Sequence, residues 1–342
     1  MDTDPLFKQI QSWTNSIPLV ILGSGASVPF GLPSMWMLGE YLKTNISFVS
    51  PDDQTQFENF KDFFDKTGDL EAALSEFHLR PNILDEIVCK TWELVNQHDL
   101  NAYDQLTDKS KYFPLAELIS HLLSSSGKKL SIITTNYDRL AEYAASFANS
   151  FICTGYSQNY FGHFSNLIHT NNLTTLKGFK GQVNIWKVHG SLDWFKTSAE
   201  QHIQFPLRHM IPADHKPSIV TPGLSKYFET HNEPYRTIST QADNEIDNAT
   251  GYLCIGYGFN DSHVQPKLIN QIKNNNKPII VMTKELTPKT KQHIIDNKCR
   301  NYILIEESGK NDTRVYSSNF GDFTLTGVSY WSLAEYIELV TE

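Results

Sequence analysis

The feature that most constrains the fold of this chain is a set of six short apolar runs, each separated from the next by a long connection. They cover residues 17–22, 130–133, 183–188, 252–255, 279–282 and 302–305. Antiparallel neighbours can be joined by tight turns, whereas parallel strands need longer crossover connections that are usually helical. The spacing therefore predicts an α/β fold with a Rossmann-like parallel sheet of about six strands.

Residues 35–126 form a candidate insertion between the first and second strands. Phenylalanine and leucine side chains recur there at helical intervals, punctuated by Pro51, Gly68 and Pro81. A chain of 342 residues can bury one large core together with such an insertion. We predict a single domain over 1–342, with a helical insert at 35–126, irregular excursions at 151–182 and 197–247, and a Rossmann-like core made of 15–34, 127–150, 183–196 and 248–342.

Composition and charge narrow the class of function. Hydrophobic residues make up 40% and charged residues 20% of the chain, which is typical of a soluble globular protein, and the net charge of −9 disfavours direct binding of nucleic acid. No apolar run approaches the ~18 residues that a membrane span needs. Residues 1–5 lack the build of a signal peptide. We expect a cytoplasmic protein without direct contacts to nucleic acid or membrane.

The cysteines and histidines do not form a metal-binding pattern. Cys89, Cys153, Cys254 and Cys299 contain no C-x-x-C pair, so neither a zinc ribbon nor a disulfide framework is expected. Cys254 lies within an apolar run and is expected to be a small core residue. No two histidines have the spacing of metal ligands on a plausible helix, and we predict no metal.

Each of the first four predicted strands ends in glycines or polar residues. These are Gly23, Gly25, Ala26 and Ser27 after the first strand, Asn136 and Asp138 after the second, His189 after the third, and Gly256 and Tyr257 after the fourth. The carboxyl ends of parallel strands meet at one edge of the sheet, where ligands bind in such folds. A glycine turn that opens a helix suits a phosphate group, because it brings free N–H groups close to it.

The same residues also have purely structural interpretations. Val28 stands where the third glycine of a dinucleotide fingerprint would be, so the glycines fit an ordinary turn about equally well. Asn136 and Asp138 suit the cap of the following helix, and a lone histidine such as His189 is commonly a hydrogen-bonded packing residue. Asp261 fits a helix cap better than a ligand.

The ordered set of motifs resembles the sirtuin family, in particular the bacterial sirtuin-like proteins that hydrolyse NAD⁺ in anti-phage defence. Its motifs are Gly-Ser-Gly-Ala-Ser at 23–27 with Gly-Leu-Pro at 31–33, Thr-Asn-Tyr-Asp at 135–138, His-Gly-Ser at 189–191 and Gly-Tyr-Gly-Phe at 256–259. Sirtuin deacetylases usually carry a four-cysteine zinc ribbon, and they have Asp-Phe-Arg where this chain has Ser-Met-Trp at 34–36. The resemblance therefore implies cleavage of NAD⁺ to nicotinamide and ADP-ribose, with water as the acceptor.

The resemblance also implies roles for individual residues. Asn136 would be the catalytic asparagine and His189 the general base, and Asp138 would bind the nicotinamide carboxamide or stabilise charge on the ribose. The rest would contact the other parts of NAD: Gly23, Gly25, Ala26 and Ser27 the pyrophosphate, Gly256 and Tyr257 the adenosine half, and Thr283 the adenine ribose.

At the level of the whole protein, the resemblance implies an NAD⁺ hydrolase that depletes NAD during abortive infection. It further implies a homo-oligomer that pairs with a HerA-type ATPase. Two alternatives stay open at this point. The first is a non-catalytic NAD or ADP-ribose sensor that regulates a partner ATPase, and the second is a sirtuin-type deacylase or ADP-ribosyltransferase.

Overall fold

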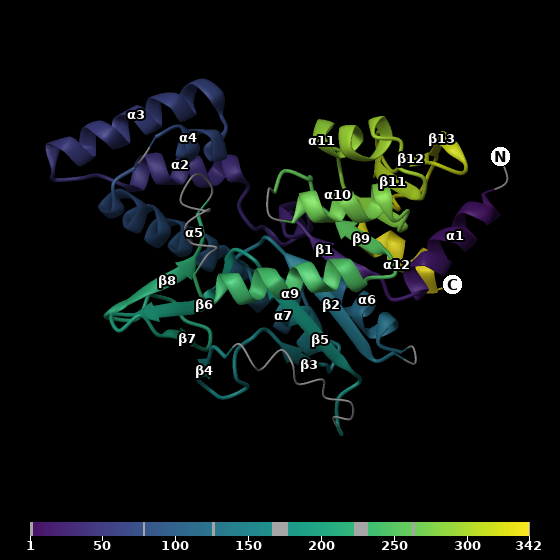
Figure 1. Ribbon diagram of the computed structural model, residues 1–342, viewed down its shortest axis with the longest axis horizontal. Coiled ribbons are helices and arrows are strands. Elements are labelled where there is room, and N and C mark those ends of the chain that lie inside the picture. Colours follow the sequence, from purple (N-terminus) through teal and green to yellow (C-terminus); the bar gives the residue numbers. More distant parts are fainter. Residues whose placement is uncertain are drawn as a thin grey trace.

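The computed structural model describes residues 3–77, 79–124, 127–165, 177–221, 232–261 and 264–341. Its centre is a nine-stranded sheet in the order β13-β12-β11-β10-β9-β1-β2-β5-β3 (Figure 1). The strands from β11 to β3 are parallel, and β12 and β13 add an antiparallel pair at one edge. The bounds are β1 Leu19–Leu22, β2 Lys129–Thr134, β3 Phe151–Cys153, β5 Gln182–Lys187, β9 Tyr252–Ile255, β10 Ile279–Met282, β11 Tyr302–Glu307, β12 Thr313–Ser317 and β13 Gly321–Leu325.

Strand β1 occupies the middle of the parallel region. Its Val20 pairs with Ile132 of β2 on one side and with Leu253 of β9 on the other. The chain runs from β1 outward through β2 and β5, and it later returns to β9 beside β1 before continuing to β10 and β11. The direction of winding therefore reverses between β1 and β9, and in doubly wound sheets ligands bind at the carboxyl ends of the strands at this switch point.

Helices cover both faces of the sheet. Successive side chains of a strand point to opposite faces, so Val20 and Leu22 pack into one apolar cluster and Leu19 and Ile21 into another. The helices of the first cluster are α1 Asp4–Asn15, α6 Pro114–Leu122, α7 Leu140–Phe147 and α12 Leu333–Thr341, and those of the second are α9 Tyr235–Asn248 and α10 Gln265–Asn274. Shorter helical segments are η1 Ser24–Ala26, η2 Val28–Phe30, α11 Pro288–Lys291 and η4 Gln292–Asp296.

The segment predicted as a helical insert contains α6 and four further helices. They are α2 Met35–Asn45, α3 Pro51–Thr67, α4 Leu70–Glu76 and α5 Pro81–Thr107. Helices α2, α3 and α4 lie to one side of the sheet (Figure 1) and share a separate apolar core with the first half of α5, in which Phe57 and Phe60 stack at 5.3 Å. The second half of α5 packs into the core of the main sheet through Ala102 and Leu106. Helix α5 therefore anchors the insert to the rest of the fold.

A second, antiparallel sheet has the order β4-β7-β6-β8. Its strands are β4 Gly162–His163, β6 Gly190–Thr197, β7 His202–Gln204 and β8 His215–Ile219. With β3 and α9, these elements fall largely in ranges 151–182 and 197–247, which the sequence predicts to be irregular. The difference arises because β3, β4 and β7 are two or three residues long and lack a fully buried apolar run.

All six apolar runs form strands, so the predicted fold class is confirmed, and the sheet is larger than predicted by β3, β12 and β13. The four cysteines are free, and Cys254 is a fully buried core residue of β9, as expected. Within the described ranges, none of the helices combines the length and apolar character needed to cross a membrane.

Candidate active site

The loop after β1 packs directly against the loop after β9. The N–H of Gly23 donates to the carbonyl of Ile255 and that of Gly25 to the carbonyl of Gly256, each at 3.1 Å. Gly256 has φ +58°, and a Cβ there would lie 2.2 Å from the nitrogen of Ala26. No side chain fits so close an approach of two backbones. These glycines therefore hold the two loops together, whatever further contact they make with a ligand.

The loop after β2 is fixed by a chain of side-chain hydrogen bonds. Nδ2 of Asn136 donates to the carbonyl of Gly23 at 2.9 Å and to Oγ of Ser27 at 3.0 Å. The Ser27 hydroxyl in turn donates to Oδ2 of Asp138 at 2.7 Å. Since a carbonyl only accepts, the contact with Gly23 sets the orientation of the Asn136 amide. No donor in the described part of the chain contacts its Oδ1, which leaves that oxygen for a ligand.

Asp138 stabilises the start of a helix and also belongs to the candidate site. Its Oδ1 accepts a hydrogen bond from the N–H of Leu140, the first residue of α7, at 3.2 Å. This contact is the helix-capping role that the sequence suggests for Asp138. Burial raises the pKa of Asp138, opposed by the charge of Lys187 and the hydroxyl of Ser27. The Lys187 ammonium donates to the backbone carbonyl of Asp138.

His189 lies in the turn between β5 and β6. The next residue, Gly190, has φ +86°, and a Cβ there would lie 2.1 Å from the carbonyl oxygen of Ser218. Nε2 of His189 is 3.0 Å from Oδ2 of Asp261, and both side chains are 8% exposed. Oδ1 of Asp261 accepts from the N–H of Val264 at 3.0 Å, just before α10. Asp261 thus caps a helix, as expected, and also contacts the histidine, which sequence reasoning missed.

Two adjoining cavities lie at this edge of the sheet. The small cavity has a volume of about 230 Å³ and contains His189 and Asp261 in its lining, and the large cavity, of about 730 Å³, runs along the ends of β1, β9 and β10. Ser27, Asn136 and Asp138 line both. Together they offer a two-part site whose large part is mainly apolar, as is usual for small-molecule sites.

Every residue proposed for the site from the sequence lines one of these cavities. Gly23, His189 and Tyr257 line the small cavity, and Gly25, Ala26, Gly256 and Thr283 line the large one, in addition to the three shared residues. Tyr257 lines the small cavity with His189, whereas its neighbour Gly256 lines the large one. The left-handed turn at Gly256 sets the direction of the following side chain, which motif spacing does not reveal.

Several lining residues were not found from the sequence. The insert contributes Glu71 to the small cavity and Lys111 and Tyr112 to the large one, and the segment before α12 contributes Trp331. No motif marks these residues, because tertiary packing alone brings them to the edge of the sheet. The sequence did indicate that Asp261 lies near the site, because it follows the fourth predicted strand and His189 follows the third, and both strands end at the same edge of the sheet. In the part of the chain that the structure describes, no three His, Cys, Asp or Glu side chains are grouped to hold a metal.

Fold and site together define a Rossmann-like α/β protein with a two-part cavity at its switch point. The chain belongs to the SIR2-like domain family, whose model matches residues 130–303. The matched region begins at β2 and includes Asn136, Asp138, His189 and Asp261, while the glycine loop after β1 precedes it.

Solved structures of Sir2 proteins resemble the chain at low sequence identity. One, described as the structural basis for the mechanism and regulation of Sir2 enzymes, is 15% identical with a TM-score of 0.46, and 97% of each chain is covered. A mutant Sir2 homologue in complex with ADP-ribose is 14% identical with a TM-score of 0.45, covering 85% of this chain and 88% of its own. A Sir2 homologue in complex with NAD is 14% identical with a TM-score of 0.41, covering 89% and 88%. A search of curated proteins gave no match.

Proposed function

We propose that this protein cleaves NAD⁺ to nicotinamide and ADP-ribose, with water as the acceptor. The observation that carries the proposal is the position of Asn136 between two adjoining cavities, one of which also contains His189 and Asp261. A two-part site of this kind suits a dinucleotide whose nicotinamide riboside half enters the small cavity and whose adenosine half occupies the large one. The combined volume lies in the range of small-molecule sites.

The chemistry assigns a task to each of Asn136, His189 and Asp261. The bond between the nicotinamide nitrogen and the ribose carbon breaks, and both bonding electrons leave with neutral nicotinamide, so no general acid is required. The free Oδ1 of Asn136 positions the attacking water or a ribose hydroxyl. His189 accepts the proton that the water loses, and the Asp261 carboxylate, 3.0 Å from the ring, stabilises the imidazolium that results.

Two features favour water over a protein substrate as the acceptor. The chain has no cysteine pairs for the zinc ribbon of sirtuin deacetylases. In addition, the hydroxyl of Ser34, which replaces the acidic residue of the deacetylase motif, accepts from the N–H of Met37 and caps α2. The side chain at position 34 therefore caps a helix in this chain.

The test is an assay of nicotinamide and ADP-ribose release from NAD⁺ by the purified protein, both alone and together with the HerA-type ATPase that the resemblance implies as a partner. Asn136→Ala and His189→Ala should abolish turnover, and the exposed-site controls Asn101→Ala and His209→Ala should retain it. Near-normal hydrolysis by either site variant contradicts the assigned roles. Stoichiometric NAD binding without nicotinamide release would instead identify a sensor, and ADP-ribose recovered on a peptide would identify a transferase.

We further propose that the enzyme acts as the NAD-depleting effector of an anti-phage defence system. An enzyme that depletes NAD continuously would kill its host, so its activity requires control by an assembly or an infection signal. We propose a homo-oligomer that associates with a HerA-type ATPase in the cytoplasm. Native mass spectrometry of the protein with and without that ATPase tests the assembly, and a monomer under both conditions contradicts it. Unchanged cellular NAD during phage infection contradicts the role in defence.

A further inference from the structure

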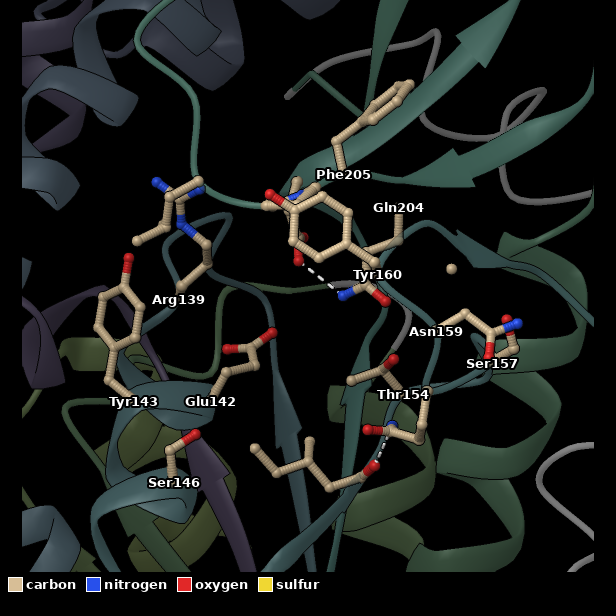
Figure 2. A pocket seen from close by; sticks show the side chains of 16 residues that line it. Arg139, Glu142, Tyr143, Ser146, Thr154, Ser157, Asn159, Tyr160, Gln204 and Phe205 are labelled. Carbon is tan, nitrogen blue, oxygen red and sulfur yellow. Dashed lines mark hydrogen bonds between the residues drawn. The ribbon is translucent and has the colours of Figure 1, made fainter.

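A third cavity, of about 410 Å³, lies beside α7 and the second sheet, apart from the proposed NAD site. It contains none of the residues assigned to that site. Figure 2 shows it from close by, with Glu142 on one side and Thr154 and Gln204 on the other. Its wall combines carboxylates, hydroxyls and amides with the side chains of Ile152, Pro206 and Leu207.

Two buried acceptors in this cavity lack a partner. Asp193 is 8% and Thr154 is 3% exposed. Gln204 donates to Oδ2 of Asp193 at 2.6 Å, but neither Oδ1 of Asp193 nor Oγ1 of Thr154 has a hydrogen-bond partner among the described residues. Buried polar atoms are nearly always paired in native proteins, so an unpaired carboxylate oxygen at a cavity wall marks a place for a donor from outside.

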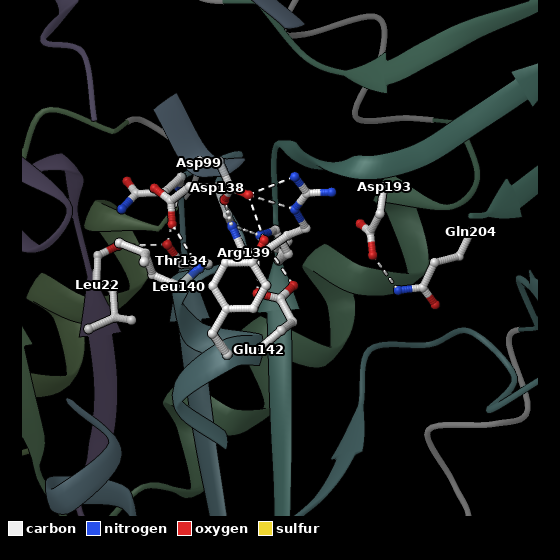
Figure 3. Close-up of polar contacts among 12 residues, drawn as sticks. Leu22, Asp99, Thr134, Asp138, Arg139, Leu140, Glu142, Asp193 and Gln204 are labelled. Atoms are coloured by element: carbon white, nitrogen blue, oxygen red, sulfur yellow. Dashed lines mark hydrogen bonds and ion pairs between the residues drawn. The ribbon is translucent and has the colours of Figure 1, made fainter. Parts of the chain in front are cut away.

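The cations near the cavity are already engaged. Figure 3 shows Arg139 turned to Asp99, whose Oδ2 accepts from Nη2 at 2.6 Å and from Nε at 2.9 Å. Lys187 forms an ion pair with Glu142 at 3.2 Å and also donates to the carbonyl of Asp138. No Lys or Arg in the part of the chain that the structure covers pairs with Asp193. The cavity therefore holds one more carboxylate than it has cations.

We propose that this cavity is a second binding site, and that its ligand is a small primary alkylammonium cation. An ammonium group has three N–H donors, which match Oδ1 of Asp193, Oγ1 of Thr154 and the carboxylate of Glu142. Its methylene groups pack against the apolar side chains of Ile152 and Leu207. The two carboxylates disfavour an anion, and a neutral alcohol brings no positive charge to Asp193.

The test compares two probes of nearly equal shape, butylamine and 1-butanol, by calorimetric titration of the full-length protein at pH 7.5. Butylamine is protonated at this pH and should bind at least about tenfold more tightly than the alcohol. Asp193→Asn and Thr154→Val should each weaken butylamine binding by about tenfold or more. Asp104→Asn, an exposed substitution on α5, is the control and should bind like the wild type.

The variants separate loss of the site from loss of the fold. Asp193→Asn removes the charge and Thr154→Val the hydroxyl, and both keep the side-chain shape, so either variant with a wild-type circular dichroism spectrum is informative. Equal affinity for the amine and the alcohol overturns the proposal. So does wild-type butylamine affinity in either variant, or the absence of amine binding up to about 10 mM.

Discussion

Nε2 of His189 lies 3.0 Å from Oδ2 of Asp261, and the two residues come from turns that follow different strands of the sheet. The second oxygen of Asp261 holds the N–H of Val264 just before α10. One carboxylate therefore ties the orientation of the imidazole to the start of a helix. In the proposed reaction, an imidazole held in this way needs little rearrangement to accept a proton.

The first prediction separates these two tasks of Asp261. Asparagine is a good helix cap, so Asp261→Asn should keep the contact with Val264 and the thermal stability. It removes the charge that is proposed to stabilise the imidazolium, so under this proposal kcat for nicotinamide release should fall by about 10- to 100-fold. Asp104→Asn, the exposed substitution on α5, serves as the control. Unchanged kcat in Asp261→Asn would show that the carboxylate only caps the helix.

The second prediction concerns the packing of the two glycine loops. Gly256 and Gly309 both have positive φ angles, +58° and +75°, but a Cβ at Gly309 meets nothing within 4 Å. Gly309→Ala should cost about 1–2 kcal/mol from backbone strain alone. Gly256→Ala adds a collision with the backbone of Gly25 and Ala26 and should cost at least twice as much in urea unfolding. Equal losses would mean that the loops can separate without cost.

The parallel core could be predicted because its strands are buried on both faces. Strands β1, β9 and β10 are apolar at every position, and such runs stand out in the sequence. Strands β12 and β13 alternate between more and less buried residues at an edge, and β3 is only three residues long. Their positions depend on pairing with β11 and β5, which local sequence does not encode.

The site could be predicted to the extent that topology alone determines it. Asn136 and His189 come together because parallel strands end at one edge, so the prediction of a parallel sheet was enough to group them. The contact between His189 and Asp261 depends on side-chain direction, and the contribution of Lys111 depends on how the insert folds back over the sheet. Neither follows from motif spacing, because each is a product of tertiary packing.

The third prediction tests the structural role assigned to the buried cysteine. Cys254 is fully buried in β9, and burial raises the pKa of its thiol well above the usual value. Cys254→Ser puts a hydroxyl in an apolar setting and should cost about 1–3 kcal/mol of unfolding free energy without changing kcat. Cys89→Ser, at a partly exposed site, should change neither. A large loss of kcat in folded Cys254→Ser would contradict this assignment.

The last prediction follows from the buried carboxyl of Glu142 on α7. Burial raises its pKa from 4.5 to about 7, opposed by the charge of Lys187, while Asp193 adds a like charge. Below pH 4.5 the carboxyl is protonated in both states. Between pH 4.5 and 7 the unfolded chain releases its proton first, so this group lowers stability as the pH rises, by a total on the order of 3 kcal/mol.

Glu142→Gln removes this titration. Relative to the variant, the wild type should therefore lose stability between pH 5 and pH 8, measured as the free energy of unfolding in urea at each pH. At pH 5 the protonated wild-type carboxyl resembles the glutamine amide, so the two proteins should then be most alike. Glu76→Gln, an exposed substitution on α4, corrects for the general effect of losing one carboxylate. Parallel curves for the wild type and Glu142→Gln would show that Lys187 keeps Glu142 ionised throughout this range, because its charge then outweighs the cost of burial.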